Sequence, residues 1–237
     1  MRPILRLGKD SDFPPSAEAL DYPNGLLAVG GELTAQRLLA AYRRGIFPWY
    51  EEPQPVLWWT PDPRSVLFPE ELHISRSMSK TLRRDKFHLS VDGQFSRVMG
   101  ECAQLRLDGL GTWIDDDMIA AYSALQALGF AHSIEVLDEG GALLGGLYGV
   151  ALGRVFFGES MFSRADDASK VALVALVSIL RRSDFEMIDC QVESDHMNSL
   201  GARTIKRLDF ERRLAQTVDI ETDTGTWQLP ATCGDLL

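Results

Sequence analysis

The pattern of apolar and polar positions differs between the first third of the chain and the remainder. Most of the prolines lie at or before residue 69, where they interrupt the apolar runs, so we expect a loop-rich N-terminal region. One helix is predicted within it. Thr34 is a suitable N-cap, apolar positions follow with helical spacing up to Tyr42, and Gly45 can end the helix. The Pro61-Asp62-Pro63 segment predicts a boundary between a small N-terminal domain, residues 1–62, and a larger domain, residues 63–237.

After this boundary the chain alternates between strand-like and helix-like patterns. Strands are predicted at residues 64–68, 87–91, 133–137, 143–151, 154–157 and 186–192. Helices are predicted at residues 75–84, 95–105, 115–128 and 168–182, and two short helices after residue 192. The neighbouring strands within 143–157 indicate a hairpin, and the whole pattern is that of a mixed domain of helices and strands.

Composition and charge narrow the classes of protein. With 237 residues, of which 45% are hydrophobic and 24% charged, the chain has ordinary globular composition. Its net charge of −10 argues against a surface covered with positive charge, so contact with nucleic acid requires a local cluster of Lys and Arg.

Such a cluster lies in the helix predicted at residues 75–84. Arg76, Lys80, Arg83 and Arg84 are spaced at i, i+4, i+7 and i+8, which places them on one helix face. This face is suited to phosphate contact. The alternative is a solvated face that forms surface ion pairs.

A carboxylate follows the strand predicted at residues 154–157. The segment turns at Gly158-Glu159-Ser160 and becomes apolar again at Met161. A carboxylate in these surroundings is partly desolvated, which makes Glu159 a candidate for binding a cation or accepting a hydrogen bond. Equally, backbone N–H groups or an arginine could satisfy it.

A second polar pair lies in the strand predicted at residues 186–192. Asp189 and Gln191 are two positions apart, so they are expected on the same strand face, where the carboxylate can fix the direction of the amide. The alternative is a polar pair on a solvent-facing strand, with Ile188, Cys190 and Val192 on the other face.

Apolar and aromatic side chains supply candidates for a binding pocket. Leu173, Leu176 and Leu180 form a stripe on the helix at 168–182, which is typical of core but could also line a pocket. Trp49 and Trp113 lie in predicted loops, where tryptophan can stack on bases, although buried tryptophan is commoner.

Several kinds of site and location are not indicated. The three cysteines and four histidines lack metal-ligand spacing, and phosphate-loop, HExxH and GxSxG motifs are absent, so we expect no metal and no cofactor. The N-terminus lacks the apolar core of a signal peptide, and the longest apolar stretch, residues 171–180, is short for a membrane span. We therefore expect a cytoplasmic protein with no membrane partner.

Motifs along nearly the whole chain resemble the bacterial leucyl/phenylalanyl-tRNA–protein transferases. They are Asn24 to Gly31, Tyr42 to Trp49, Trp58 to Arg64, His73 to Met78, Gly111 to Ile114, His132 to Val136, Gly158 to Arg164, Ala168 to Lys170 and Ile188 to Val192. The resemblance implies an α+β fold, in which a small N-terminal α/β domain precedes a GNAT-like domain related to acyl-CoA N-acyltransferases.

The activity that the resemblance implies is an aminoacyl transfer. Leu or Phe, and to a lesser extent Met, would pass from aminoacyl-tRNA to proteins that begin with Arg or Lys and mark them for N-degron degradation. The enzyme would act as a monomer, without metal or cofactor. An aminoacyl ester is already activated, so the enzyme mainly has to align amine and ester and accept one proton.

The resemblance also assigns roles to the candidate residues. Asp189 would orient Gln191, whose carbonyl holds the attacking amine, and Glu159 would bind the aminoacyl-adenosine end or the acceptor's cationic end. Arg76, Lys80, Arg83 and Arg84 would contact tRNA. The substrate pocket would be formed by Trp49, Trp113, Phe156, Met161, Leu173, Leu176, Leu180 and Ser194.

Two departures from the family pattern stand out. Ser194 occupies a position that is often Asn, and Asp115 to Asp117 make the segment after Ile114 more acidic than usual. Two rival hypotheses are a CoA-dependent N-acetyltransferase, for which the pyrophosphate loop is missing, and a tRNA- or peptide-binding module without catalysis.

Overall fold

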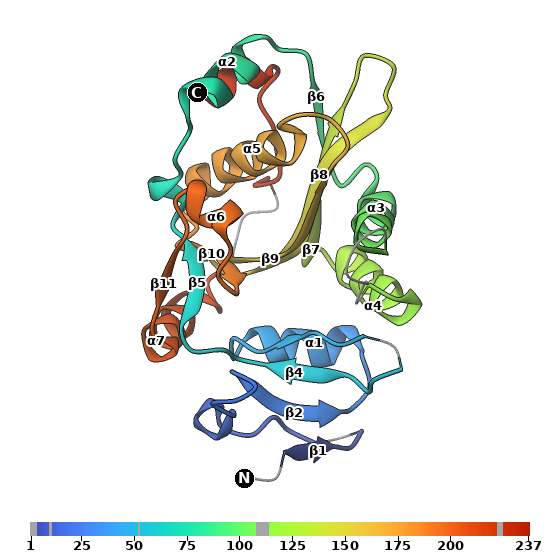
Figure 1. Ribbon diagram of the computed structural model, residues 1–237, viewed down its shortest axis with the longest axis vertical. Coiled ribbons are helices and arrows are strands. Elements are labelled where there is room, and N and C mark those ends of the chain that lie inside the picture. The colour runs from blue at the N-terminus through green and yellow to red at the C-terminus, as the bar shows by residue number, and fades with distance from the viewer. Residues whose placement is uncertain (1–3, 10, 52, 108–113, 222–224) are drawn as a thin grey trace.

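The computed structural model describes residues 4–9, 11–51, 53–107, 114–221 and 225–237, with the side chains of residues 105–107 excepted. Two β-sheets organise these residues (Figure 1). A four-stranded sheet contains residues up to 59, and a seven-stranded sheet begins at residue 64. The predicted α+β class is confirmed.

The N-terminal region contains a sheet where loops were predicted. Its strands are β1 (Leu5–Leu7), β2 (Leu26–Gly30), β3 (Phe47–Pro48) and β4 (Leu57–Trp59), in the order β1-β2-β4-β3. Each strand has five residues or fewer, and β1 pairs in parallel with β2 across more than 20 residues of sequence, Leu5 with Ala28. Strands this short carry almost no period, so the residue pattern did not predict them. Most of the described residues of this region lie outside helices and strands, as the loop-rich prediction stated.

The one predicted helix of this region is present. Helix α1 (Ala35–Tyr42) begins after Thr34, whose hydroxyl accepts a hydrogen bond from the backbone N–H of Arg37 at 3.2 Å. The chain leaves the helix through Gly45 at a φ of 70°, a conformation that glycine adopts without a steric penalty. Tyr42 therefore lies in the last turn of α1 and is fully buried.

The larger sheet has the strand order β11-β5-β10-β9-β8-β7-β6. Its strands are β5 (Arg64–Leu67), β6 (His88–Val91), β7 (Ala131–Leu137), β8 (Leu143–Leu152), β9 (Val155–Ser163), β10 (Met187–Gln191) and β11 (Arg203–Ile205). Only β9 and β10 are paired in parallel; the other described neighbours in this sheet are antiparallel. The predicted hairpin is formed by β8 and β9, with Leu152 opposite Val155.

Helices cover both faces of the larger sheet. Helix α5 (Ala168–Arg182) lies on one face, and α3 (Phe95–Leu107) and α4 (Asp116–Ala127) lie on the other (Figure 1). The remaining helices are α2 (Arg76–Arg83), α6 (Asp195–Ser199) and α7 (Arg207–Thr217), with 3₁₀ turns at η1 (Ser16–Glu18), η2 (Pro69–Glu71) and η3 (Cys233–Leu236). None of the helices among the described residues has the length and apolar character that crossing a membrane requires.

The buried side chains form two clusters. One cluster joins α1 and the N-terminal sheet to α3 and α4, and the other surrounds α5. Eleven residues of α5 are buried, as expected for a helix that is apolar on most of its surface. The N-terminal sheet thus shares one hydrophobic core with the larger part of the chain.

Strand β9 differs from the prediction in a way that matters for function. It does not end at Phe157 but continues to Ser163, because Gly158-Glu159-Ser160 forms a bulge and not a turn. Gly149 on β8 is opposite Gly158, and Tyr148 is opposite Ser160, so Glu159 is the extra residue. A bulge redirects the side chain of the inserted residue.

Candidate active site

A pocket opens where β9 and β10 stop pairing. The parallel ladder runs from Met187 and Val155 to Asp189 and Phe157, and beyond it the two strands separate. The resulting β9/β10 pocket has a volume of about 350 Å³. Residues 158–161 line it on the β9 side, and residues 190–192 line it on the β10 side.

Most of the predicted pocket residues line the β9/β10 pocket. These are Trp49, Phe156, Met161, Leu173, Leu176 and Ser194, together with Glu159 and Gln191. Leu180 is buried on α5 but is not among the lining residues, so its predicted place in the pocket was wrong. It lies one turn beyond Leu176, farther along the helix. Trp113 lies outside the described residues.

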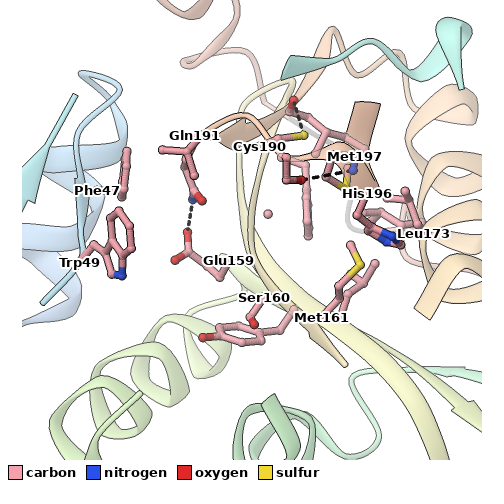
Figure 2. A pocket seen from close by; sticks show the side chains of 18 of the residues that line it. Phe47, Trp49, Glu159, Ser160, Met161, Leu173, Cys190, Gln191, His196 and Met197 are labelled. Carbon is pink, nitrogen blue, oxygen red and sulfur yellow. Dashed lines mark hydrogen bonds between the residues drawn. The ribbon is translucent and has the colours of Figure 1, made fainter. Parts of the chain in front are cut away.

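Glu159 is the centre of a hydrogen-bonded group inside this pocket. Tyr42 donates to its Oε1 at 2.7 Å and Tyr122 donates to its Oε2 at 2.9 Å. The side-chain amide of Gln191 donates to Oε1 from Nε2 at 3.2 Å. Figure 2 shows Gln191 and Glu159 facing each other, with Trp49 beside them and Met161 deeper in the pocket. The carboxylate is therefore satisfied by side chains from α1, α4 and β10.

The number of protons in this group depends on the charge of Glu159. The hydroxyls of Tyr42 and Tyr122 also hydrogen-bond to each other, so three oxygen-to-oxygen contacts close a ring. Each hydroxyl carries one proton, and ionised Glu159 adds none, which leaves two protons for three contacts. If Glu159 is protonated, each contact can hold one proton.

Burial acts in the same direction as this count, because it favours the protonated form of Glu159. Burial raises the pKa of Glu159 from 4.5 to about 7, an effect that the hydrogen bonds from Tyr42 and Tyr122 oppose. Two smaller contributions are included in this value: the charge of Asp189 raises the pKa of Glu159, and the charge of Arg64 lowers it. A carboxyl group with a pKa near 7 exchanges protons readily at neutral pH.

Gln191 is held in place by its own backbone. Its φ is 61°, and the N–H of Val192 donates to the carbonyl of Cys190 at 2.7 Å, which closes a γ-turn around it. Positive φ is costly for a residue with a side chain and is found at functional sites, where the surrounding structure enforces it. The turn directs the Gln191 side chain into the β9/β10 pocket.

Asp189 acts on this turn and not on the Gln191 amide. Its Oδ1 accepts the backbone N–H of Gln191 at 3.0 Å. Both Asp189 and Arg64 are fully buried and form a two-pronged ion pair, Nε to Oδ1 at 2.7 Å and Nη2 to Oδ2 at 2.6 Å. The guanidinium lies between the rings of Phe47 and Phe210, 4.8 Å and 4.6 Å from their centroids.

The prediction that Asp189 and Gln191 share a strand face was therefore wrong. Val66 on β5 is opposite Asp189 and Ser65 is opposite Gln191, so Cys190 is an extra residue that shifts the register. As a result Asp189 points towards Arg64, while Cys190, Gln191 and Val192 all line the pocket. A single inserted residue is enough to reverse which face a side chain occupies.

The predicted basic residues form an exposed face on α2. Arg76, Lys80, Arg83 and Arg84 are exposed, and within the described part of the chain none of them forms an ion pair. Ser75 caps the helix by accepting the N–H of Met78, and Thr81 donates to Asp167 beside the start of α5 at 3.1 Å. The basic face of α2 thus lies next to the helix that lines the pocket.

Three residues of this site were not singled out as functional from the sequence. Tyr42 had served only as a helix position, Tyr122 lies in a predicted helix far along the chain, and Arg64 was noted only within a motif. The usable signal in the sequence was an arginine at the start of a predicted, largely apolar strand, residues 64–68, because an arginine that becomes buried there needs a carboxylate partner. Among the described residues, no group of three His, Cys, Asp or Glu side chains is arranged to hold a metal ion.

Comparison with known proteins adds independent findings. The sequence profile of the leucyl/phenylalanyl-tRNA protein transferases matches residues 66–215, and the profile of their N-terminal domain matches residues 31–62. The leucyl/phenylalanyl-tRNA–protein transferase of Pseudomonas entomophila (strain L48) is 58% identical over 214 residues, which cover 90% of this chain and 94% of the relative. The transferase of Nitrosospira multiformis is 57% identical over 213 residues, which cover 90% and 91%.

Solved structures show a weaker likeness. A GCN5-related glucosamine N-acetyltransferase region of a fungal β-N-acetylglucosaminidase is 11% identical, with a TM-score of 0.42, and the match covers 61% of this chain and 20% of that one. The L-PGS structure from Bacillus licheniformis is 10% identical, with a TM-score of 0.39, over 71% and 53% of the two chains. At such identity the likeness concerns the fold alone.

Proposed function

Because this chain belongs to the leucyl/phenylalanyl-tRNA–protein transferase family, an aminoacyltransferase family, we propose that its β9/β10 pocket holds the aminoacyl end of Leu-tRNA or Phe-tRNA. Methionyl-tRNA is a poorer substrate. The acceptor is a protein whose first residue is Arg or Lys, and its new N-terminus marks it for N-degron degradation in the cytoplasm. The enzyme works as a monomer in which residues 1–62 form the smaller domain.

The apolar end of the pocket supports this choice of amino acid. Phe156, Leu173, Leu176 and Ile188 line it with hydrocarbon, which favours Leu and Phe over polar side chains. Side chains branched at Cβ are stiff and bulky close to the backbone, so Val and Ile enter less readily.

The polar end of the pocket supports the choice of acceptor. Glu159 supplies a carboxyl group for the acceptor's α-amino group, and the acidic residues Glu193 and Asp195 flank Ser194 at the rim. These exposed acids suit an acceptor whose first side chain is cationic. An acceptor that begins with an acidic residue meets like charge at the same place.

The reaction consists of one bond exchange. The neutral amine attacks the carbonyl carbon of the aminoacyl ester, the new C–N bond forms, and the C–O bond to the tRNA ribose breaks. One proton from nitrogen goes to the ribose oxygen that leaves. A second proton is lost earlier, when the ammonium form of the acceptor becomes an amine, and the reference pKa of this group is about 7.7–8.0.

Gln191 positions the amine, and Glu159 accepts its proton. Since Gln191 donates its Nε2 to Glu159, its carbonyl Oε1 points elsewhere and can accept a hydrogen bond from the amine. Ionised Glu159 takes up the proton of the ammonium form, which its pKa of about 7 makes inexpensive. Asp189, paired with Arg64, accepts the backbone N–H of Gln191 and so holds the γ-turn that directs the Gln191 side chain.

The observation that carries this proposal is the meeting of Glu159 and Gln191 at the mouth of an apolar pocket. The test incubates labelled Leu-tRNA, Phe-tRNA and Met-tRNA with acceptors that differ only in the first residue, Arg, Lys or Glu. We expect label on the Arg and Lys acceptors only. In folded variants, Asp189→Ala and Gln191→Ala should each lower turnover by about 100-fold or more. Near-normal turnover in both would overturn the assigned roles.

A further inference from the structure

The C-terminal segment, residues 225–237, packs against the pocket from outside. It follows the part of the chain that matches the family profile, which ends at residue 215. In Figure 1 the C-terminus lies beside α2, at the far side of α5 from β10. Cys233 and Leu236 belong to the buried cluster around α5, and the partly buried Trp227 and Leu229 pack against it.

Trp227 joins this segment to the wall of the β9/β10 pocket. Its indole lies 6.1 Å from the ring centroid of Phe156 at an interplanar angle of 51°, and 6.5 Å from that of Phe185. Phe156 is fully buried and also lines the pocket. The ring of Phe156 is therefore in contact with the pocket and with Trp227 at once.

The position of Trp227 is fixed on its other side by His132. The two rings are stacked, with centroids 3.6 Å apart and planes 19° apart. His132 cannot rotate freely, because its Nδ1 bonds to Asp92 at 2.7 Å and its Nε2 to the carbonyl of Gly129 at 3.2 Å. The indole thus lies between a fixed imidazole and the pocket wall.

The end of the segment is anchored separately. The N–H of Cys233 donates to Asp85 at 2.8 Å, the thiol of Cys233 donates to the carbonyl of Phe87 at 3.2 Å, and Leu236 is buried. These contacts lie just after α2 and are distinct from those of Trp227. The two ends of the segment can therefore be altered independently.

We propose that Trp227 is a positioning residue that sets the size of the amino acid which the β9/β10 pocket accepts, by supporting Phe156 from behind. This inference rests on the proposed function, in which the pocket holds the Leu or Phe side chain. Removing the indole leaves space behind Phe156, and a buried ring relaxes only partly into such space. The pocket then becomes deeper, which favours the larger substrate.

The experiment measures the ratio of kcat/KM for Phe-tRNA to that for Leu-tRNA, with both substrates competing in one reaction. This ratio is independent of the fraction of enzyme that is folded. We expect Trp227→Ala to raise the ratio about fivefold, within the range by which one side-chain group changes selection in an apolar pocket. Trp227→Phe keeps an aromatic ring behind Phe156 and should restore the ratio to within about twofold of the wild type.

Two further variants separate the outcomes. Leu236→Ala disturbs the other end of the segment, so it should lower the melting temperature and leave the ratio unchanged. Met161→Ala alters the pocket lining directly and should shift the ratio in any case. If Met161→Ala shifts it and Trp227→Ala does not, or if Leu236→Ala shifts it as much as Trp227→Ala, the role of Trp227 is refuted. If Met161→Ala has no effect either, the error lies in the proposed function of the pocket.

Discussion

Individual residues of the site were predictable to different degrees. Glu159 was identified because a carboxylate beside apolar residues is unusual, and Gln191 because it lies two positions after Asp189 in a predicted strand that also matches a family motif. Their hydrogen-bond partners were not identified. Tyr42 and Tyr122 are 80 residues apart, and no local pattern indicates that two helices bring their hydroxyls to one carboxyl group.

At the residue scale we expect the stability of the protein to report the proton on Glu159. Its pKa is raised to about 7 in the folded chain and is near 4.5 when unfolded, so between these pH values the folded state binds more protons. The free energy of unfolding therefore falls as pH rises from 4.5 to 7 and levels off above that.

The measurement compares wild type with Glu159→Gln in urea unfolding at several pH values. Glutamine keeps the shape and does not titrate, so the difference in stability between the two proteins should change across this window and be constant above it. A difference that is the same at pH 5 and pH 7.5 would show that Glu159 has ordinary acidity.

Regular elements were predicted well where local signals exist, and poorly where pairing is distant. Thr34 caps α1 as predicted, whereas Ser75 and Asp115, which were predicted as the first residues of their helices, are the N-caps of α2 and α4. The bulges at Glu159 and Cys190 were missed, since a strand period assumes that every residue is paired. These two irregularities are what turn Glu159 and Gln191 towards each other.

The γ-turn at Gln191 permits a test of stored strain. Gln191→Ala keeps the cost of positive φ, whereas Gln191→Gly removes it, so the glycine variant should be more stable than the alanine variant by about 1 kcal/mol. Both should lose activity. Gln126, within α4, is the matched control, where glycine should be less stable than alanine by about 1 kcal/mol. Thermal unfolding of the four variants gives the sign of the stability difference between glycine and alanine at each of the two positions.

The basic face of α2 predicts how binding depends on salt. Changing Arg76, Lys80, Arg83 and Arg84 to Gln should weaken binding of all tRNAs alike and flatten the slope of log affinity against log salt. Arg212→Gln is the control, because Arg212 is an exposed arginine on α7 that pairs with Asp209. The slope is read from fluorescence titrations between 50 and 200 mM salt, about the range in which phosphate contacts dominate. An unchanged slope contradicts the predicted contact.

At the scale of the whole molecule, the site combines residues of the N-terminal region with residues of the larger sheet. Tyr42 comes from α1 and lies against Phe157 of β9 with ring centroids 4.8 Å apart. The sequence indicated two regions but not that the smaller one completes the hydrogen-bonded group around Glu159. Prolines can predict where one region ends, but they do not indicate which residues of the two regions will be in contact.

Tyr42→Phe tests this link without disturbing packing. The phenol donates a hydrogen bond that lowers the pKa of Glu159, so its loss should raise that pKa. The ascending limb of the pH–rate profile should then move to higher pH, with a lower rate at neutrality. Tyr50→Phe, which removes a hydroxyl bonded to Asp115, should leave the midpoint where it is. Equal midpoints for Tyr42→Phe and wild type would contradict the claim that the hydrogen bond from Tyr42 lowers the pKa of Glu159.

The shared core between the two sheets has a consequence for how the enzyme becomes competent during synthesis. Until α1 packs against α4, the carboxyl group of Glu159 on β9 stays in contact with water and lacks the hydrogen bond from Tyr42. Its pKa then stays near the ordinary value of a glutamate. Given the role proposed for Glu159, aminoacyl transfer begins only after the N-terminal region has packed against the larger sheet, so activity reports that this packing is complete.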